Sequence, residues 1–282
     1  MSDLGPVDPG RAGEAAWLRR WRVRPYGDSV TTASSTHTPV RTEEGAPAML
    51  KVAHVDEEVR GADLLAALDG NGVARVLERK DGAVLLERAT GPGDLVALVE
   101  AGHDDEATRI ICDAAARIHA ASADVLAADD PPELLDLDTW FRHLFSHGGE
   151  LGAFHRQGAD VAARLLADAR DPVVLHGDLH HGNVLDFGER GWLAIDPKGL
   201  LGDAEFDVCN LLCNPSHERA LEPGRLERQL GVVVATTGFE PARLADWLVA
   251  WCALSSTWFA IDDDPRLSAS AAAIGELALT LR

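Results

Sequence analysis

The pattern of hydrophobic and polar positions divides the chain near residue 90. Before that point, short apolar runs separated by Gly, Asp and Asn predict strands and one helix. Beyond residue 104, apolar residues recur every three to four positions, which predicts helices. We therefore expect an α+β protein in three parts. They are a flexible N-terminus over residues 1–18, a β-rich part over 19–89 and a mainly helical part over 90–282.

A short hairpin interrupts the helical part. Residues 173–175 (Val-Val-Leu) predict a buried strand, and it leads into residues 176–183 (His-Gly-Asp-Leu-His-His-Gly-Asn). Two further apolar runs flank residues 188–191 (Gly-Glu-Arg-Gly), a turn by composition. If this hairpin is centred on Glu189 and Arg190, Asn183 faces Asp196 across the ladder, and both lie close to Asp178.

Asp178, Asn183 and Asp196 follow one another in the order of the phosphoryl-transfer loop of kinases, D-x-x-x-x-N and then a metal-binding Asp. Phosphoryl transfer needs one carboxylate that orients a hydroxyl group and accepts its proton. It also needs oxygen ligands that hold Mg²⁺ on the phosphates. We expect Asp178 to be the catalytic residue that meets the substrate, and Asn183 and Asp196 to be the metal ligands.

Residues 186–188 spell Asp-Phe-Gly, the metal-binding triplet of protein kinases. They come only three residues after Asn183 and run into the turn, at the far end of the hairpin. We interpret Asp186 as a turn-entry residue and assign the metal role to Asp196 instead.

Lys51 lies inside an apolar strand, residues 48–53, where an unpaired ammonium group would be costly to bury. A kinase needs such a lysine for the nucleotide phosphates, paired with a carboxylate of the next helix. Glu58 is the expected partner and Glu57 the alternate. The alternative is a lysine that protects an edge strand from aggregation.

Several segments together resemble one family, the aminoglycoside/hydroxyurea antibiotic resistance kinases, and within it the aminoglycoside 6-phosphotransferases (streptomycin 6-kinases). The resemblance covers nearly the whole chain from about Trp21. It is densest in residues 47–53, 85–89, 175–181, 191–197 and 233–241. It implies a protein-kinase-like bilobal fold. It also implies ATP and Mg²⁺ as cofactors and phosphorylation of an aminoglycoside, with streptomycin at the 6-position as the expected substrate.

The resemblance also implies nucleotide contacts in the first lobe. The backbone of Glu87 and Ala89, at the link between the lobes, would bind the adenine edge. The connection holding Ser34, Ser35 and Thr36 would cover the phosphates, since small hydroxyl residues with free backbone N–H groups can cradle phosphate. A plain polar hairpin loop is the alternative for these three residues.

A cationic sugar needs carboxylates that face the cleft. Asp203, Glu205 and Asp262 are the candidates, together with Asp263 and Asp264, which could equally form a solvated helix end. The formal charge of −20 argues against nucleic acid or an anionic membrane as partner and would attract a small cationic aminoglycoside, although acidity can serve solubility alone. The oligomeric state stays open.

The four cysteines are scattered, and we interpret them as reduced core thiols, which fits a cytoplasmic protein. The first 20 residues contain no apolar signal core, and no stretch of 18 uninterrupted apolar residues predicts a membrane span. Two rival functions remain. One is a related kinase acting on hydroxyurea or a metabolite, and the other is an inactive ATP-binding scaffold. The joint presence of Lys51, Asp178, Asn183 and Asp196 argues against the scaffold.

Overall fold

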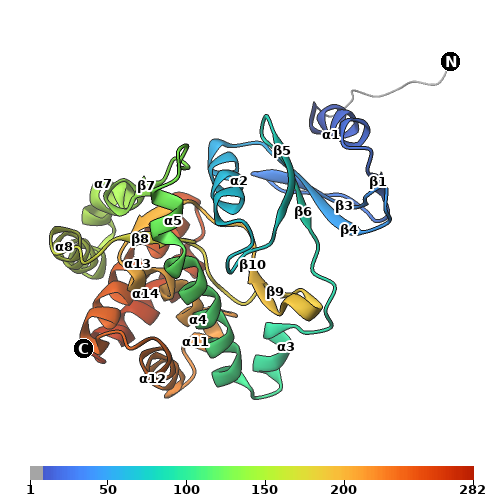
Figure 1. The fold of residues 1–282 in the computed structure, drawn as a ribbon. Coiled ribbons are helices and arrows are strands. Elements are labelled where there is room, and N and C mark those ends of the chain that lie inside the picture. The colour runs from blue at the N-terminus through green and yellow to red at the C-terminus, as the bar shows by residue number, and fades with distance from the viewer. Residues whose placement is uncertain (1–8) are drawn as a thin grey trace.

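The computed structural model describes residues 9–282, with side chains from residue 13, and shows two lobes joined by one linker (Figure 1). The smaller N-terminal lobe is a twisted sheet with one long helix beneath it, and the larger lobe is mainly helical. This is the α+β, protein-kinase-like bilobal arrangement expected from the sequence. The linker runs from residue 88 to residue 94, between the last strand of the sheet and the first helix of the larger lobe.

The N-terminal lobe is built on a six-stranded sheet of order β1-β3-β4-β6-β5, in which β2 also pairs with β3. The neighbouring strands are antiparallel. Its elements are α1 (Pro9–Arg20), β1 (Arg24–Pro25), β2 (Val30–Thr31), β3 (Ser35–Arg41), β4 (Pro47–Ala53), α2 (Asp56–Leu68), β5 (Val76–Lys80) and β6 (Ala83–Glu87). Strand β4 lies between β3 and β6, so Lys51 is on an interior strand and not on an edge.

The N-terminal helix α1 was not expected from the sequence, and the prediction of a flexible stretch is wrong over residues 9–18. Residues 1–8 lie outside the described part of the chain. Trp17 and Leu18 pack against a small core that contains Val40 and Leu50 of the sheet. Glu14 accepts hydrogen bonds from the hydroxyl groups of Ser29 and Thr38, at 2.9 and 2.5 Å. Tertiary packing therefore orders this Gly-rich segment.

The C-terminal lobe holds most of the helices and two small sheets. The helices are α3 (Leu95–Glu100), α4 (Asp104–Ala120), α5 (Ser122–Leu126), α6 (Leu137–Trp140), α7 (Arg142–Leu151), α8 (Ala153–Ala167), α9 (Ala204–Asp207), α10 (Cys209–Leu212), α11 (His217–Ala220), α12 (Arg225–Thr237), α13 (Pro241–Ile261) and α14 (Pro265–Leu279). Strands β7 (Leu135–Asp136), β11 (Leu200–Gly202) and β8 (Val173–Leu175) form one sheet. Strands β9 (Val184–Asp186) and β10 (Trp192–Ala194) form a hairpin around the 3₁₀ turn η1 (Gly188–Arg190).

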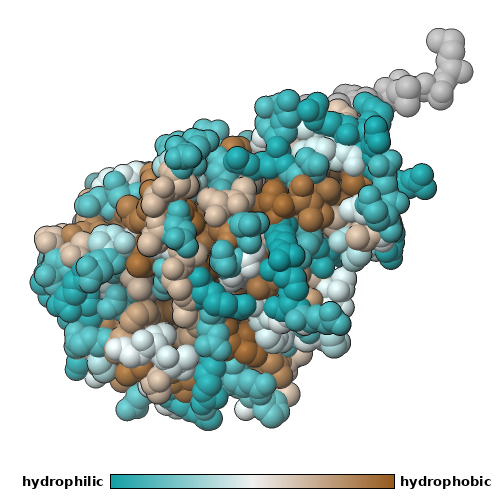
Figure 2. Space-filling model, viewed as in Figure 1, coloured by the Kyte–Doolittle hydropathy of each residue, from teal (hydrophilic) through white to brown (hydrophobic). Residues whose placement is uncertain are grey.

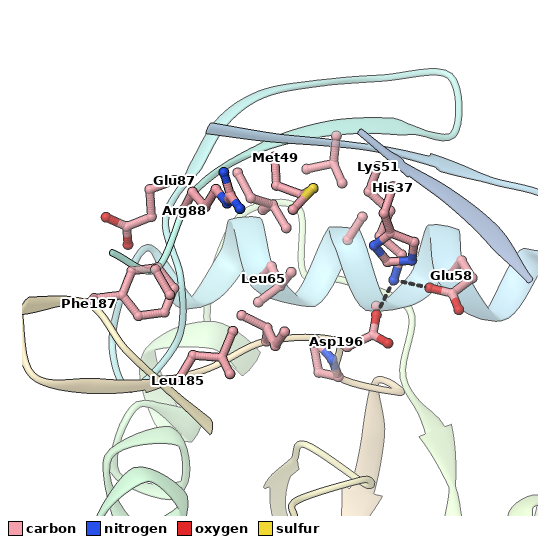
Figure 3. Close-up of a pocket in the computed structure, with 17 residues that line it drawn as sticks. His37, Met49, Lys51, Glu58, Leu65, Glu87, Arg88, Leu185, Phe187 and Asp196 are labelled. Carbon is pink, nitrogen blue, oxygen red and sulfur yellow. Dashed lines mark hydrogen bonds and ion pairs between the residues drawn. The ribbon is translucent and has the colours of Figure 1, made fainter. Parts of the chain in front are cut away.

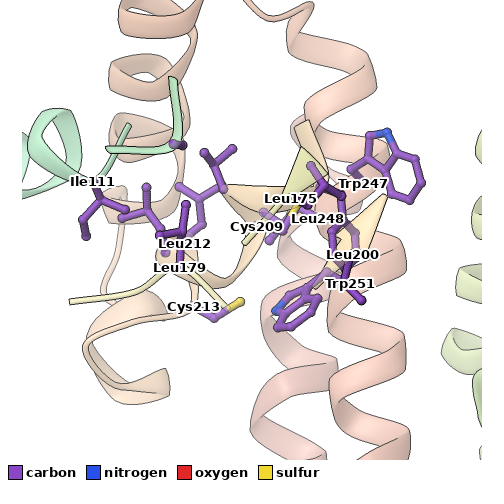
Figure 4. Packing of buried hydrophobic residues seen from close by; sticks show 14 of the residues in the cluster. Ile111, Leu175, Leu179, Leu200, Cys209, Leu212, Cys213, Trp247, Leu248 and Trp251 are labelled. Carbon is purple, nitrogen blue, oxygen red and sulfur yellow. The ribbon is translucent and has the colours of Figure 1, made fainter. Parts of the chain in front are cut away.

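Helix α13 is the centre of the larger core (Figure 4). Trp247 and Trp251 lie on its buried face, and Leu179 of the loop after β8 packs into the same cluster. These two tryptophans therefore belong to the packed core. Among the described residues, α13 alone is long and apolar enough to cross a membrane, but 67% of that window is buried inside the fold. That burial is typical of a core helix.

The four cysteines are free and buried, as predicted. Burial raises the pKa of the Cys112 thiol to about 12 and that of Cys209 and Cys252 well above the usual value. The visible surface is a mosaic in which hydrophilic side chains prevail around the rim of both lobes (Figure 2). This agrees with the strongly charged composition.

Candidate active site

A cavity of about 350 Å³ lies between the two lobes (Figure 3). Its apolar part lies between the sheet and the β9–β10 hairpin, and Leu65 of α2 contributes to one side. The apolar lining residues include Met49, Val84, Leu86, Leu185, Phe187 and Ile195. Glu87 and Ala89 line one end, and Lys51, Glu58 and Asp196 line the other. A flat aromatic group with a charged tail would fit this division into apolar and polar ends.

Lys51 forms ion pairs with both Glu58 of α2 and Asp196 (Figure 3). Lys51 and Glu58 are 7% and 6% exposed, so the pair is almost sealed from solvent. The choice between the two glutamates is thereby resolved in the structure. Glu58 takes Lys51, and Glu57 pairs with Lys198 at 3.1 Å. Two consecutive glutamates of one helix therefore hold two lysines from different lobes.

The loop after β8 is held by a buried carboxylate, Asp207. It accepts hydrogen bonds from the backbone N–H groups of His176 and Gly177, at 3.0 and 2.6 Å, and contacts the His119 ring at 2.9 Å. Burial alone would raise the pKa of Asp207, but the hydrogen bond and charge of His119 outweigh it and lower the pKa. Asp207 is thus an ionised anchor of the loop.

The His176 ring ties this loop to the following segment. Its Nδ1 accepts from the backbone N–H of Asp178 at 3.2 Å, and its Nε2 donates to the carbonyl oxygen of Ile195 at 2.8 Å. Burial lowers the pKa of His176, so the ring is neutral and each nitrogen keeps a fixed role. His176 therefore holds the loop together.

Two amide side chains orient the Asp178 carboxylate. Asn210 donates to Oδ1 at 2.8 Å, and Asn183 donates to Oδ2 at 3.2 Å and to the Asp178 carbonyl oxygen at 2.9 Å. Burial raises the pKa of Asp178, although nearby cations including Lys198 oppose the shift. The carboxylate is thus held in one orientation and its basicity is raised, as a general base requires. Since the side-chain nitrogen of Asn183 is used in this way, its side-chain oxygen Oδ1 is the atom left for a metal ion.

The register of the hairpin differs by one residue from the prediction. Val184 pairs with Ala194 and Asp186 with Trp192, so Asn183 faces Ile195 and not Asp196. The backbone N–H of Ile195 donates to the Asn183 carbonyl oxygen at 2.8 Å. Asp196 is the next residue and has a positive φ of 66°. This left-handed conformation accompanies its contact with Lys51, so the expected oxygen ligands gather at the open end of the hairpin even though the register was wrong.

The Asp-Phe-Gly triplet holds the interlobe linker. Asp186 Oδ1 accepts from the backbone N–H of Gly188 at 2.8 Å, which is the expected turn, and Oδ2 accepts from that of Gly93 at 2.9 Å. Gly91 donates to the Asp186 carbonyl oxygen at 2.9 Å. Asp186 lies at the closed end of the hairpin, as predicted, and the metal role of Asp196 stays a prediction.

The hydroxyl residues proposed for the phosphates lie partly in a strand. Ser35 and Thr36 begin β3 and are buried, so only Ser34 belongs to the connecting loop, and the prediction of a loop over all three is wrong. The Thr32 hydroxyl accepts from the backbone N–H groups of Ser34 and Ser35, at 3.3 and 3.1 Å. A phosphate role for this turn stays a prediction.

Of the five acids proposed for the substrate, Asp203 is excluded by its environment. It is 1% exposed and pairs with the buried guanidinium group of Arg243, and it also accepts from the backbone N–H of Arg170 at 2.9 Å. Glu205 lies 3.9 Å from the same guanidinium group and keeps a 15% exposed side chain. Asp262 is exposed at the end of α13. Glu205 and Asp262 remain predictions.

Two residues of the site were not assigned a role from the sequence. Asn210 lies within an apolar turn, and its polarity there was the available signal. Lys198 follows Asp196 by two positions, and its Nζ lies 4.0 Å from Asp178 Oδ2. Burial disfavours its charge, but Asp178 and Glu57 outweigh burial and raise the pKa of Lys198. Both residues depend on tertiary contacts that no local pattern reports.

Comparisons with known proteins agree with this geometry. Residues 20–263 match the family model described as aminoglycoside/hydroxyurea antibiotic resistance kinase. A streptomycin 3″-kinase of Klebsiella pneumoniae is 50% identical over 247 residues, which cover 86% of this chain and 90% of that protein. A streptomycin 6-kinase of Streptomyces griseus is 28% identical, with 93% and 87% covered. A thermostable mutant of an aminoglycoside phosphotransferase in complex with ADP and hygromycin B shares the fold, with a TM-score of 0.67, 13% identity and coverage of 95% and 97%.

Proposed function

Because the chain belongs to the aminoglycoside/hydroxyurea antibiotic resistance kinase family, we propose that it transfers the γ-phosphoryl group of ATP to a hydroxyl group of streptomycin. The observation that carries the proposal is the pairing of Lys51 with Asp196 at one end of the interlobe cavity, next to a loop in which Asn183 donates to the Asp178 carboxylate. Each has the chemistry that one part of phosphoryl transfer requires. Their joint placement also argues against the inactive scaffold.

The cavity orients the nucleotide from its two ends. The adenine ring would lie in the apolar slot, with its edge toward the backbone of Glu87 and Ala89, and the phosphates would point to Lys51. Lys51 donates to the phosphates from a fixed position, since Glu58 and Asp196 hold it on both sides. The side-chain oxygen of Asn183 and the carboxylate of Asp196 would hold Mg²⁺, which neutralises phosphate charge when it is bound.

Asp178 acts on the acceptor. Its carboxylate accepts a hydrogen bond from the sugar hydroxyl, directs the oxygen lone pair at the γ-phosphorus and takes up the proton as the new bond forms. Asn210 and Asn183 keep both carboxylate oxygens oriented through this step. Positioning and a matched base are the main contributions a protein makes to phosphoryl transfer, because little covalent chemistry is left for it to perform.

Streptomycin is the proposed acceptor because both curated relatives described above are streptomycin kinases. They differ in the hydroxyl group that their names give. The 50% identity supports the 3″-hydroxyl over the 6-hydroxyl that the sequence resemblance implied. The formal charge of −20 would draw a guanidinium-bearing sugar to the protein. Hydroxyurea is a second candidate, since the family description includes it.

A coupled assay of ADP release, run with streptomycin, kanamycin and hydroxyurea, tests the proposal. We expect turnover with streptomycin, a mass gain of one phosphate in the product and much slower product formation by the Asp178→Ala variant. Phosphorus–proton NMR of the product then reports the position. Turnover with hydroxyurea but not with streptomycin would replace the proposed substrate, and ADP release that no acceptor increases would contradict the proposed activity.

A further inference from the structure

Lys198 occupies a position at the reacting centre that the assignments above leave unused. Its Nζ lies 3.1 Å from Glu57 Oε1 and 4.0 Å from Asp178 Oδ2. Glu57 belongs to α2 of the N-terminal lobe, and Asp178 belongs to the catalytic loop of the other lobe. The ammonium group therefore lies between the proposed base and the helix that also holds Lys51.

The backbone of Lys198 is fixed relative to Asp178. Its N–H donates to the carbonyl oxygen of His176 at 2.7 Å, in the same loop as the base. On the other side, Gly61 of α2 packs directly on the carbonyl oxygen of Pro197. The start of the lysine side chain is thus set by the fold, while its four-carbon stem can adjust the position of the ammonium group.

We propose that Lys198 is a second catalytic cation of the transfer, and that its ammonium group donates to an oxygen of the phosphoryl group as it passes to the acceptor. This inference rests on the proposed phosphotransferase function. The acceptor oxygen must lie within about 3 Å of an Asp178 oxygen and within about 3.5 Å of the phosphorus. A group 4.0 Å from Asp178 Oδ2 is therefore within reach of the equatorial phosphoryl oxygens.

The charges around the site favour this role. The carboxylates of Asp178, Asp196, Glu57 and Glu58 outnumber the ammonium groups of Lys51 and Lys198. Lys51 is held by two of these carboxylates, and its side chain is 9% exposed. The Lys198 side chain is 17% exposed, and those of its two carboxylate neighbours are 26% and 37% exposed. Of these two lysines, Lys198 is thus the one with access to the space beside Asp178 where the acceptor must enter.

The step balances without a further reactant. A bond forms between the acceptor oxygen and the γ-phosphorus, and the bond from that phosphorus to the β–γ bridging oxygen breaks, with its electron pair leaving on ADP. The hydroxyl proton goes to Asp178. Lys198 transfers no proton and only donates a hydrogen bond. Once Asp178 has taken up the proton it is neutral and attracts the Lys198 ammonium group less strongly. This happens at the stage when the negatively charged phosphoryl group reaches the acceptor oxygen.

The rival role for Lys198 is a purely structural one, an ion pair with Glu57 that links α2 to the larger lobe. The two roles differ in what Glu57→Gln does. If the role is structural, Glu57→Gln and Lys198→Met should have equal effects, because each removes one partner of the same ion pair. A catalytic cation survives Glu57→Gln, since the lysine is still present. Lys198→Arg adds a second comparison, because it keeps the charge and the donors.

The experiment measures kcat, the KM for ATP and the affinity for ADP alone and for ADP with magnesium and aluminium fluoride, a mimic of the phosphoryl group in transfer. We expect Lys198→Met to lower kcat by about 10²- to 10³-fold, the cost of one donor to developing charge. The KM for ATP and the affinity for ADP alone should change less than threefold. Binding of the fluoride complex should weaken in parallel with kcat. The kcat of Lys198→Arg should be more than tenfold higher than that of Lys198→Met, and the kcat of Glu57→Gln should stay within tenfold of the parent value.

Lys80→Met is the matched control, because Lys80 ends the exposed strand β5 on the outer side of the lobe. It should leave every constant unchanged. Equal losses in Glu57→Gln and Lys198→Met, or unaltered binding of the fluoride complex in Lys198→Met, would overturn the proposal. The fluoride complex needs no acceptor. If the parent protein binds it but phosphorylates no acceptor, the proposed function fails while the role of Lys198 is still decided.

Discussion

Gly61 of α2 lies so close to the carbonyl oxygen of Pro197 that a methyl group at position 61 would collide with it. The two residues come from different lobes and are separated by about half of the chain. Around this contact, Lys198 pairs with Glu57, and Lys51 pairs with Glu58 and Asp196. The placement of α2 against residues 196–198 therefore determines the geometry of the whole polar end of the cavity.

The first prediction concerns this contact. Gly61→Ala should lower the free energy of unfolding by about 1–3 kcal/mol, the usual cost of overpacking, and should also lower kcat because α2 is displaced. Gly231→Ala is the matched control, since Gly231 lies in helix α12 with open space around it. That change should stabilise the protein by about 0.5–1 kcal/mol. Urea unfolding of both variants checks the pair, and a neutral Gly61→Ala would show that the lobes are not in this contact.

The second prediction concerns the base. Asp178→Ala should lower kcat by about 10²- to 10⁴-fold, the range for a positioned general base. ATP binding, measured by calorimetry, should change little, because Lys51 and the apolar slot remain. Asn210→Ala should have a smaller effect of the same kind, since it removes one of the two donors that orient the carboxylate. Near-normal turnover in Asp178→Ala would contradict the assignment.

The third prediction separates the two aspartates of the hairpin. Asp196→Asn should abolish Mg²⁺-dependent turnover, because a carboxylate ligand is lost. Asp186→Asn keeps only one of the two carboxylate oxygens that accept from Gly93 and Gly188. It should cost about 1 kcal/mol of stability, the net value of one hydrogen bond, and leave kcat within threefold. A magnesium titration of turnover checks both, and the reverse result would return the metal role to the Asp-Phe-Gly triplet.

The fourth prediction is a pH dependence of stability. His155 is buried, its Nε2 contacts the Ser256 hydroxyl at 2.9 Å, and burial lowers its pKa from the usual 6.5. Below pH 6.5 the unfolded chain binds a proton at His155, whereas the folded chain leaves this ring unprotonated. The free energy of unfolding therefore falls as the pH drops. His155→Gln should flatten part of this decline between pH 7.5 and 5.5 in urea unfolding. The exposed His147→Gln should not, and equal slopes in all three proteins would refute the mechanism.

The chemistry of the site was predictable from the sequence because its residues come from a contiguous motif and one unusual lysine. Asp178, Asn183 and Asp196 lie within 19 residues. In the structure Asn183 donates to the Asp178 carboxylate, and Asp196 pairs with Lys51 at one end of the cavity. The choice between Glu57 and Glu58 was not predictable, because it depends on which lobe each side of α2 faces. The one-residue error in the hairpin register arose from its turn, where three residues form η1 and the phase of the ladder depends on their conformation.

The failed predictions have a common cause. Asp203 looked like a substrate acid, but its partner Arg243 lies 40 residues away and buries it. Residues 9–18 looked loose by composition, but Trp17 and Leu18 find a surface on the sheet that orders them as a helix. In each case the local pattern was read correctly and a tertiary contact changed the outcome.

The β9–β10 hairpin contacts both ends of the nucleotide site. Its open end carries Asn183 and leads to Asp196, while Asp186 at its closed end holds the linker whose backbone would meet adenine. Three paired residues of strand span roughly 10 Å. The length of the hairpin thus sets the distance between the adenine site and the metal site, independently of how far the lobes open. Lengthening the hairpin by two residues would increase this distance and misplace the phosphates, whereas an insertion in the β5–β6 turn would leave the distance unchanged.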